Sequence, residues 1–396
     1  MVAPLGLSQH WQLDPRLAFL NHGSFGACPR PVLEEQTALR EALERSPVDF
    51  LARQLERRLD AAREALAAFV DAEPEGLAFM PNATAGVNTF LRAFPIATGD
   101  HLLVTDHAYL AARNALDAIA QERGAVVDVV TLPYPGATRA GILDAVLAAV
   151  TPKTRLALLD HVTSPSALVL PLRELVQALA ERGVETLVDG AHGPGMVPVS
   201  LRELGAAAYA ANCHKWLCAP KGAAFLWVAP RWKTRVRPLA IGLGATSPRT
   251  DRSRFRAEFD WPGTQDPTPW LCIPEALRFL DVLIDGGAAG LMAHNRAVAL
   301  AERVRLAELL GTRLPCEDAL VGSMACVELP PMSPPPAPDP SSPDPLQVAL
   351  FERHQIEIPV VPFPTGRRFV RLSVQAYNAA GDFDRLRSAL ASRLGS

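Results

Sequence analysis

Two short segments carry residue types that could do covalent chemistry. In TLVDGAHGPG (186–195), an apolar run ends in Asp189, followed shortly by His192. Ligands of open α/β sheets bind at the carboxyl ends of strands, where such side chains would lie. In ANCHKWLCAPKG (211–222), Lys215 lies in a largely apolar stretch. A half-buried lysine has a lowered pKa and can act as a nucleophile or form a Schiff base. Each residue also has a simpler interpretation: Asp189 as a turn cap, and Lys215 as a strand-end lysine that reaches solvent.

Lysine is rare in this chain, which narrows the candidates for such chemistry. Lysine and arginine together number 39, and nearly all of them are arginine. The lysines are Lys153, Lys215, Lys221 and Lys233. A reaction that needs a lysine amine therefore has four candidates.

The pattern of apolar residues predicts the strands and helices that would position these side chains. Short apolar runs alternate with segments of helical period through the first half of the chain. The expected strands are 77–80, 101–106, 125–132, 155–162 and 185–190, and the expected helices are 31–45, one after Pro47, 110–123, 141–150 and 171–182. Strands that alternate with helices of about 10–15 residues indicate βαβ units. The pattern predicts an α/β fold with a mostly parallel central sheet that helices cover on both faces.

The character of the chain changes after about residue 245. Segment 249–270 is polar, aromatic and rich in arginine, and is expected to be a long loop. Segment 330–345 is rich in proline and is expected to be a mobile, extended surface loop. Helices over 273–285 and 288–310, a strand within 368–378 and a final helix are also expected. The expected division is an N-terminal segment, 1–20, packed with the small domain; a large domain, 21–255; and a small α+β domain, 256–396.

Composition excludes several classes of function. Acidic residues number 42 against 39 basic ones, a net charge of −3, so a broad basic footprint for nucleic acid or an anionic membrane is not expected. The six cysteines form no CxxC pair, and no metal site is expected. The chain begins without the features of a signal peptide, and no apolar run of about 18 residues occurs. A cytoplasmic protein without a membrane span is therefore expected.

Together, VDGAH (188–192) and HKWL (214–217) resemble the cofactor site of the class V aminotransferase family. These fold-type-I enzymes use pyridoxal 5'-phosphate. The resemblance implies a large cofactor-binding domain with a smaller C-terminal domain. It also implies that the Asp189 carboxylate faces the pyridine nitrogen and keeps it protonated. Lys215 would form the Schiff base with the cofactor and later move the Cα proton.

The same resemblance assigns further side chains to the cofactor. NATAGVN (82–88) looks like the family's phosphate turn, where Ala83 and Thr84 hold the phosphate at a helix N-terminus. In DHAYLAAR, either His107 or Tyr109 occupies the position of the aromatic that stacks on the pyridine ring, and Tyr109 is favoured. The remaining implied contacts are Ser164 and His192 near the ring hydroxyl, and Asn212 and His214 at the phosphate. Without the resemblance, these segments would be an ordinary helix cap and strand-end residues.

Two later segments imply a partner and a substrate. PGTQDPTPWLCIPEAL (262–277) resembles the segment through which Gly263 and Thr264 reach the phosphate of a neighbouring subunit. This implies a homodimer with shared active sites. RFVRLSVQAYN (368–378) is similar to the strand whose arginine, here Arg371, clamps the substrate α-carboxylate. The implied substrate is an amino acid or a small molecule derived from one.

Longer stretches, including NHGSFGACPRPV, PVDFL and HKWLCAPKG, resemble the isopenicillin N epimerase-like branch, which favours epimerisation. C–S lyase or cysteine desulfurase activity and transamination are the alternatives, because they use the same residues. A desulfurase needs a nucleophilic cysteine on a mobile loop, and Cys316 and Cys326 fit core packing better. A nucleotide-binding dehydrogenase is disfavoured, since NHGSFGACP (21–29) lacks the GxGxxG pattern. A catalytically silent protein that retains the fold is the non-enzyme alternative, which the presence of Lys215 and Asp189 disfavours.

Overall fold

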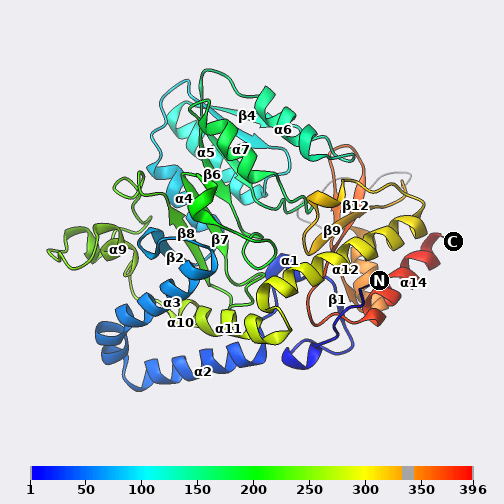
Figure 1. The fold of residues 1–396 in the computed structure, drawn as a ribbon, viewed down its shortest axis with the longest axis horizontal. Helices are drawn as coiled ribbons and strands as arrows, with labels where there is room; N and C mark the ends of the chain where they lie inside the picture. The colour runs from blue at the N-terminus through cyan, green and yellow to red at the C-terminus, as the bar shows by residue number, and fades with distance from the viewer. Residues whose placement is uncertain (1, 332–342, 395–396) are drawn as a thin grey trace.

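A seven-stranded sheet forms the centre of the protein, in a computed structural model that describes residues 2–331 and 343–394 (Figure 1). Its strands are β2 Leu77–Met80, β3 His101–Thr105, β4 Val126–Val130, β5 Thr154–Asp160, β6 Glu185–Asp189, β7 Ala208–Asn212 and β8 Ala224–Val228. They lie in the order β2-β8-β7-β6-β5-β3-β4. Neighbours are parallel except at β8, which runs antiparallel to β2 and β7. The predicted mostly parallel sheet is confirmed.

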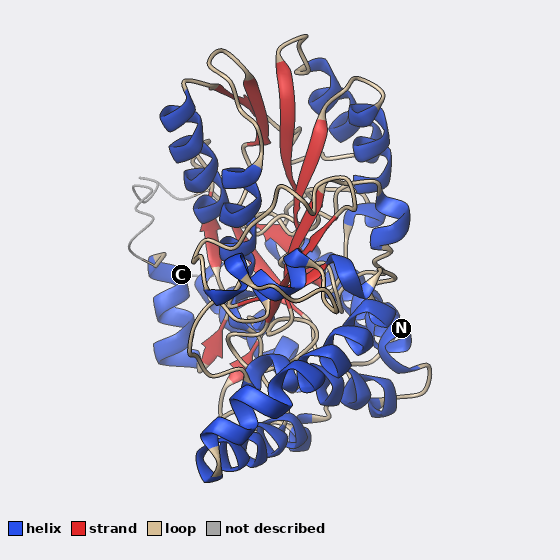
Figure 2. Ribbon diagram, turned by 90° about the vertical axis from the view of Figure 1, so that its left-hand side faces the viewer, coloured by secondary structure: helices blue, strands red, loops and turns tan. Residues whose placement is uncertain are grey.

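Helices flank this sheet on both sides (Figure 2). They are α1 His22–Phe25, α2 Arg30–Arg45, α3 Leu55–Phe69, α4 Ala83–Ala93, α5 Leu110–Arg123, α6 Arg139–Ala148, α7 Leu172–Ala180 and α8 Leu201–Leu204. The helix predicted after Pro47 begins as a π-helical stretch, Asp49–Gln54, before α3. The predicted helix over 110–123 is confirmed. It ends at Gly124, whose φ of 69° lies in the left-handed region that glycine adopts without strain.

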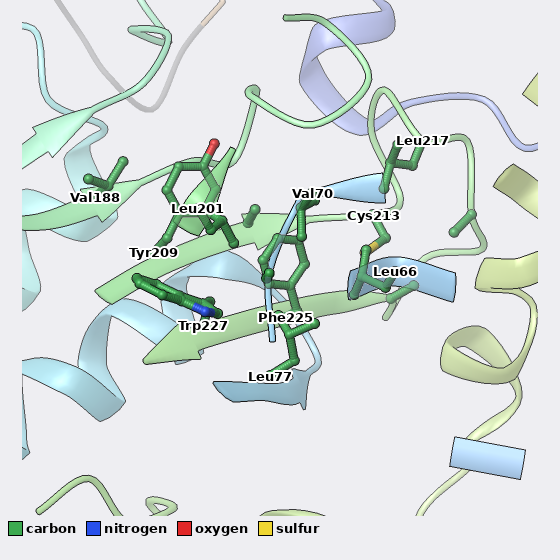
Figure 3. Packing of buried hydrophobic residues seen from close by; sticks show 14 of the residues in the cluster. Leu66, Val70, Leu77, Val188, Leu201, Tyr209, Cys213, Leu217, Phe225 and Trp227 are labelled. Carbon is green, nitrogen blue, oxygen red and sulfur yellow. The ribbon is translucent and has the colours of Figure 1, made fainter. Parts of the chain in front are cut away.

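Alternate residues of each strand enter two separate cores. On β3, Leu102 and Val104 pack into the core that contains residues of α4 and α5, whereas Leu103 joins the core that contains residues of α3 and α7. Figure 3 shows the second core, in which Tyr209 and Phe225 from neighbouring strands lie among aliphatic side chains. Side chains alternate between the faces of a strand, so a strand covered on both faces is apolar throughout. That is why short, uninterrupted apolar runs predicted these strands.

The C-terminal part forms a second, antiparallel sheet. Its strands, in the order β11-β12-β9, are β9 Met324–Glu328, β11 Val360–Pro362 and β12 Arg368–Ser373. The helices that share its core are α12 Gly287–Leu310, α13 Pro345–His354 and α14 Ala380–Leu394. Strand β1, Ala18–Phe19, pairs in parallel with β10, Ile356–Glu357, so the N-terminal segment contacts this part of the protein. The division into domains stays a prediction.

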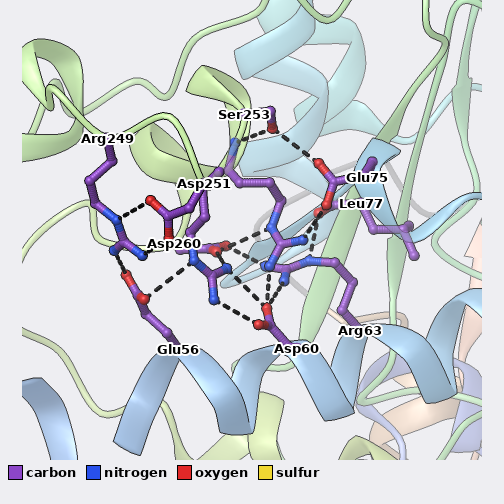
Figure 4. A network of polar contacts seen from close by, with 11 residues as sticks. Glu56, Asp60, Arg63, Glu75, Leu77, Arg249, Asp251, Ser253 and Asp260 are labelled. Atoms are coloured by element: carbon purple, nitrogen blue, oxygen red, sulfur yellow. Dashed lines mark hydrogen bonds and ion pairs between the residues drawn. The ribbon is translucent and has the colours of Figure 1, made fainter. Parts of the chain in front are cut away.

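The prediction of a long loop over 249–270 is wrong in part, because two short helices lie within it. These are α9 Arg254–Phe259 and α10 Thr268–Leu271, and α11 Ile273–Leu283 follows. A network of ion pairs ties α9 to α3 (Figure 4). Buried Arg63 pairs with Asp260, and Arg256 pairs with both Asp260 and Asp60. Arg63 and Asp260 are 197 residues apart in the sequence, so the local sequence pattern could not predict the ion pair that holds α9 against α3.

The proline-rich surface loop predicted over 330–345 falls mainly on residues 332–342, which lie outside the described part of the chain. Pro345 is the first residue of α13. A backbone N–H at this position has no partner within the helix, so proline costs no hydrogen bond there. Asp344 caps this helix, and its Oδ1 accepts the N–H of Leu346 over 2.8 Å. Nowhere in residues 2–331 or 343–394 is a helix both long and apolar enough to cross a membrane.

Candidate active site

A cavity of about 230 Å³ opens at the carboxyl ends of the neighbouring strands β5, β6 and β7. The last residue of each strand lines it, at the edge where α/β sheets bind ligands. Nine residues predicted from the sequence line this cavity: Ala83, Thr84, Tyr109, Ser164, Asp189, His192, Asn212, His214 and Lys215. The predicted residues outside its lining are His107, Gly263, Thr264 and Arg371.

Lys215, a candidate nucleophile, lines the cavity. The N-terminal segment holds the lysine backbone, because His22 Nε2–H donates to the Lys215 carbonyl over 3.0 Å. Gly26 packs so closely that a Cβ there would lie 2.2 Å from a backbone oxygen of the lysine segment, so only glycine fits. Lys215 Nζ lies 3.1 Å from His192 Nε2. Burial lowers the pKa of Lys215 to about 8, although the charge of Asp189 opposes the shift.

Two buried carboxyl groups lie at adjacent strand ends. Asp160 and Asp189 are register partners on β5 and β6, and each is 3% exposed. The Ala191 N–H donates to Asp189 Oδ1 over 3.0 Å, and the Tyr109 N–H donates to Asp160 Oδ1 over 3.4 Å. Burial raises the pKa of both carboxyl groups, and the charge of Asp189 raises the pKa of Asp160 further. When one carboxyl of the pair is ionised, it is therefore that of Asp189.

The N-terminus of α4 forms another wall of the cavity. Asn82 caps this eleven-residue helix through its side chain, and Asn212 Oδ1 accepts the N–H of Ala83 over 2.8 Å. His214 Nδ1–H donates to the carbonyl of Ala223 over 3.0 Å, which leaves Nε2 as its free ring nitrogen. The positive end of a helix dipole attracts anions, so this wall suits a phosphate group.

The two candidates for ring stacking lie in different surroundings. Tyr109 lines the cavity and is 46% exposed. His107 is 3% exposed, and its Nδ1 lies 2.7 Å from Ser166 Oγ. Its ring also contacts Tyr134 and Phe363 edge-on. Tyr109 is thus available to a ligand, whereas His107 is engaged in a polar and aromatic cluster outside the cavity lining.

Arg371 lies behind the cavity wall, in the middle of β12. Its guanidinium donates to the carbonyl and hydroxyl of Ser164 and, over 3.1 Å, to Ser24 Oγ. Both serines line the cavity. The Nε–H of Arg371 has no partner among the described residues. A buried guanidinium with a spare donor suits a carboxylate ligand, because buried donors are normally paired.

Gly263 and Thr264, predicted to reach a neighbouring subunit, lie away from the cavity of their own chain. Both residues are exposed. Thr264 lines a separate groove of about 440 Å³, together with Val48 and Leu243. These two apolar side chains are 68% and 80% exposed. The contact with a partner subunit stays a prediction.

Three lining residues of chemical interest were not predicted from the sequence. Ser24 and Phe25 belong to the one-turn helix α1, inside NHGSFGACP (21–29), a segment whose glycine spacing does not match a nucleotide-binding loop. Asp160 ends an apolar strand in the same manner as Asp189. This shared pattern could have predicted Asp160 as a lining residue, because neighbouring parallel strands end at the same edge of a sheet.

The groups that face the cavity fit pyridoxal 5'-phosphate. Lys215 offers an amine of lowered pKa to an aldehyde, and Asp189 offers a buried carboxylate to a pyridine nitrogen. The helix N-terminus at Ala83 suits the phosphate, and Tyr109 offers an accessible aromatic ring. Each chemical feature of the cofactor therefore has a matching group on the cavity wall.

Comparisons with known proteins agree with this geometry. The family model for aminotransferase class-V matches residues 28–386. The isopenicillin N epimerase of Amycolatopsis lactamdurans is 35% identical over 392 residues, which cover 96% of this chain and 95% of that protein. A probable chloroplastic L-cysteine desulfhydrase of Arabidopsis thaliana is 30% identical over 95% of this chain and 83% of that protein. The structure of the cystine C-S lyase C-DES with cysteine persulfide has a TM-score of 0.81 at 21% identity, covering 95% of this chain and 98% of that one. The chain belongs to the class V aminotransferase family of fold-type-I enzymes that depend on pyridoxal phosphate.

Proposed function

We propose that the protein is an epimerase that inverts Cα of an amino acid, or of a substrate derived from one, with a free α-carboxylate. The observation that carries this proposal is one cavity with the amine of Lys215 and the carboxyl of Asp189 on its wall and the guanidinium of Arg371 directly behind it. Similarity to an isopenicillin N epimerase over nearly the whole chain favours epimerisation among the reactions of the family.

The side chains divide the work of moving a Cα proton. Pyridoxal phosphate, when bound, supplies an electron sink for the electron pair that the departing proton leaves at Cα. Asp189 is placed to hold a proton at the pyridine nitrogen, and protonated Asp160 beside it leaves Asp189 as the ionised member of the pair. Lys215 Nζ, with its pKa lowered to about 8, can take or return a proton on one face of Cα near neutral pH, and inversion requires that the other proton transfer occur on the opposite face.

Arg371 would position the substrate. Its unpaired Nε–H and its hydrogen bonds to Ser24 and Ser164 place a positive charge next to the cavity, where it can bind an α-carboxylate. Tyr109 would stack on the ring, while Thr84 and His214 would contact the phosphate. Together these contacts would orient Cα toward Lys215.

A C–S lyase is the second candidate, because a probable L-cysteine desulfhydrase is 30% identical to this chain. Such a reaction could use the same lysine and carboxylates. A desulfurase that carries sulfur on its own cysteine is disfavoured. Burial raises the pKa of the Cys326 thiol to about 12 and also raises the pKa of Cys316, so neither thiol forms the reactive thiolate readily.

We further propose a cytoplasmic homodimer with shared active sites. Phe25, at the cavity, is 73% exposed, and the groove beside Thr264 is lined by exposed apolar side chains. A partner subunit would cover this surface, and Gly263 and Thr264 would reach the partner's phosphate site. Free cysteines suit a reducing compartment. Light scattering of the holoenzyme at micromolar concentration should give the mass of a dimer, and a monomer would contradict the shared site.

Incubating the holoenzyme with a panel of amino acids in deuterated water tests the reaction. Deuterium at Cα with inversion supports the epimerase. Pyruvate with sulfide or ammonia would establish a lyase instead, and a keto acid with aminated cofactor would establish an aminotransferase. No exchange at Cα with any amino acid, in protein that binds the cofactor, would refute action on amino acids.

A further inference from the structure

The amine of Lys215 ends a chain of two hydrogen bonds that begins at the next residue, Trp216. The indole Nε1–H of Trp216 donates to His192 Nδ1 over 3.2 Å. His192 Nε2 lies 3.1 Å from Lys215 Nζ. Trp216 and His192 are 1% and 3% exposed, so the indole–imidazole hydrogen bond is shielded from water, while the half-buried amine of Lys215 faces the cavity.

The indole determines which imidazole nitrogen carries the proton. An indole N–H can only donate, so Nδ1 of His192 must present its lone pair. A neutral imidazole with a bare Nδ1 carries its proton on Nε2. That Nε2–H faces Lys215 Nζ, and only a neutral amine has a lone pair to accept it. An ammonium in this position would set two N–H donors against each other.

We propose that Trp216 is a positioning residue that holds His192 in the Nε2–H tautomer, so that His192 donates to Lys215 Nζ and favours the free-base amine. The neutral amine is the form that attacks an aldehyde and the form that can remove a Cα proton. The inference rests on the proposed role of Lys215. It adds Trp216, which does not line the cavity and would touch neither cofactor nor substrate.

Other charged groups face the same amine from the surrounding elements. Asp189 on β6 favours the ammonium, and Asp160 on β5 does so only when it is ionised, whereas Arg371 on β12 disfavours it. His22, which holds the lysine backbone, is neutral because burial lowers its pKa to about 3. Burial also lowers the pKa of His192 well below its ordinary value, so its ring is neutral too. Among the described residues, the contact from His192 is the hydrogen bond that favours the free amine against the charge of Asp189.

The basicity of Lys215 can be measured without turnover. The full chain, freed of bound cofactor with hydroxylamine, is treated briefly with acetic anhydride at a series of pH values, and acetylation of each lysine peptide is quantified by mass spectrometry. Wild-type Lys215 should acetylate with a midpoint near pH 8. In Trp216→Phe the His192 ring is free to present a lone pair to the ammonium. The midpoint should then rise by about one pH unit, and the rate at pH 7 should fall about tenfold.

Two further variants make the result specific. Trp232→Phe removes another indole N–H, one without a hydrogen-bond partner in the described chain, and should leave the midpoint unchanged. His192→Gln can accept from the indole through Oε1 and donate to the amine through Nε2, so it should keep the wild-type midpoint. Exposed Lys153 reports reagent concentration in every sample.

An unchanged midpoint in Trp216→Phe, or a midpoint in His192→Gln as high as in Trp216→Phe, would overturn the proposal. If Trp216→Phe does not fold, the pair His192→Gln and His192→Leu decides, because only the glutamine can donate to the amine. A midpoint that rises in His192→Leu but not in His192→Gln supports the proposal. Equal midpoints in the two variants overturn it. These outcomes do not depend on the reaction catalysed. A failure of Cα exchange would instead refute the proposed function and leave the midpoints unaffected.

Discussion

Replacing Arg371 by methionine should separate the stability of this protein from its affinity for substrate. Arg371 is a buried cation, and its partners among the described residues are all uncharged: Ser164, Ser24 and, at 3.5 Å, Asn21. A charge held in a protein interior without a counter-charge is costly. Methionine has a similar length, no charge and a flexible apolar chain. The ligand-free protein should therefore tolerate Arg371→Met.

Two opposing effects set the magnitude in the ligand-free protein. Removing the unpaired charge favours the folded state by several kcal/mol, and each hydrogen bond lost opposes this by about 0.5–1.5 kcal/mol. Because Arg371 donates four hydrogen bonds, the two effects nearly cancel, and the free energy of unfolding should change by less than about 2 kcal/mol. A bound α-carboxylate, in contrast, would lose its partner. At about 3–5 kcal/mol for a broken buried pair, kcat/KM should fall by roughly two to four orders of magnitude.

The assay pairs urea unfolding of the ligand-free protein with Cα exchange kinetics. Arg367→Met is the matched control, since Arg367 is an exposed arginine nearby that pairs with Glu328. It should leave kcat/KM unchanged. Unfolding of Arg371→Met at lower urea, combined with unchanged kcat/KM, would refute the reasoning, because Arg371 would then be a structural residue.

Three further outcomes follow from the buried charges. Lys215→Arg should abolish borohydride-stable incorporation of pyridoxal phosphate, and Lys221→Arg should retain it; labelling of the first variant at another lysine would be contradictory. The pKa of Asp160 is raised above its unfolded value, so the native state binds more protons and stability falls as pH rises. Asp160→Asn should therefore lose less stability between about pH 5 and 8 in urea unfolding, and an equal loss would argue against a protonated Asp160. Asp260→Ala should lower the free energy of unfolding by about 3 kcal/mol, because Arg63 loses a buried partner; a loss below about 1 kcal/mol would mean that the network is redundant.

The central sheet was predictable because a strand buried on both faces is apolar at successive positions of the sequence. A run such as HLLVT (101–105) is apolar at successive positions, and each position fills one of two cores. Helix α9 has no comparable pattern in its own sequence. Its anchor is the pairing of Asp260 with Arg63, which joins residues far apart in the sequence, and charged residues in a polar segment are typical of a loop as well. The direction of β8 was likewise set by its neighbours in the sheet rather than by its own residues.

The site was predictable where a residue type is rare or a motif is specific. Lys215 is one of four lysines, and Asp189 ends a strand in a recognisable pattern. Asp160 was missed, since its significance comes from strand register with Asp189 rather than from its own neighbours. The hydrogen bond from Trp216 to His192 could not be predicted either. It depends on the path of two loops that meet beside the cavity, and sequence spacing does not specify their contact.

The ligand-free site holds charged groups that its own side chains do not balance. Arg371 has no anionic partner in the described chain, Asp160 and Asp189 are buried together, and the pKa of half-buried Lys215 responds to the charges of all three. Each imbalance corresponds to a group that the cofactor or the proposed substrate brings: a carboxylate, a pyridine nitrogen or an aldehyde. A ligand that binds only the folded state at 100 times its Kd adds about 2.7 kcal/mol of stability. The buried charges that make this site chemically useful therefore also make the folded protein depend on its ligands, as expected where function and stability compete for the same residues.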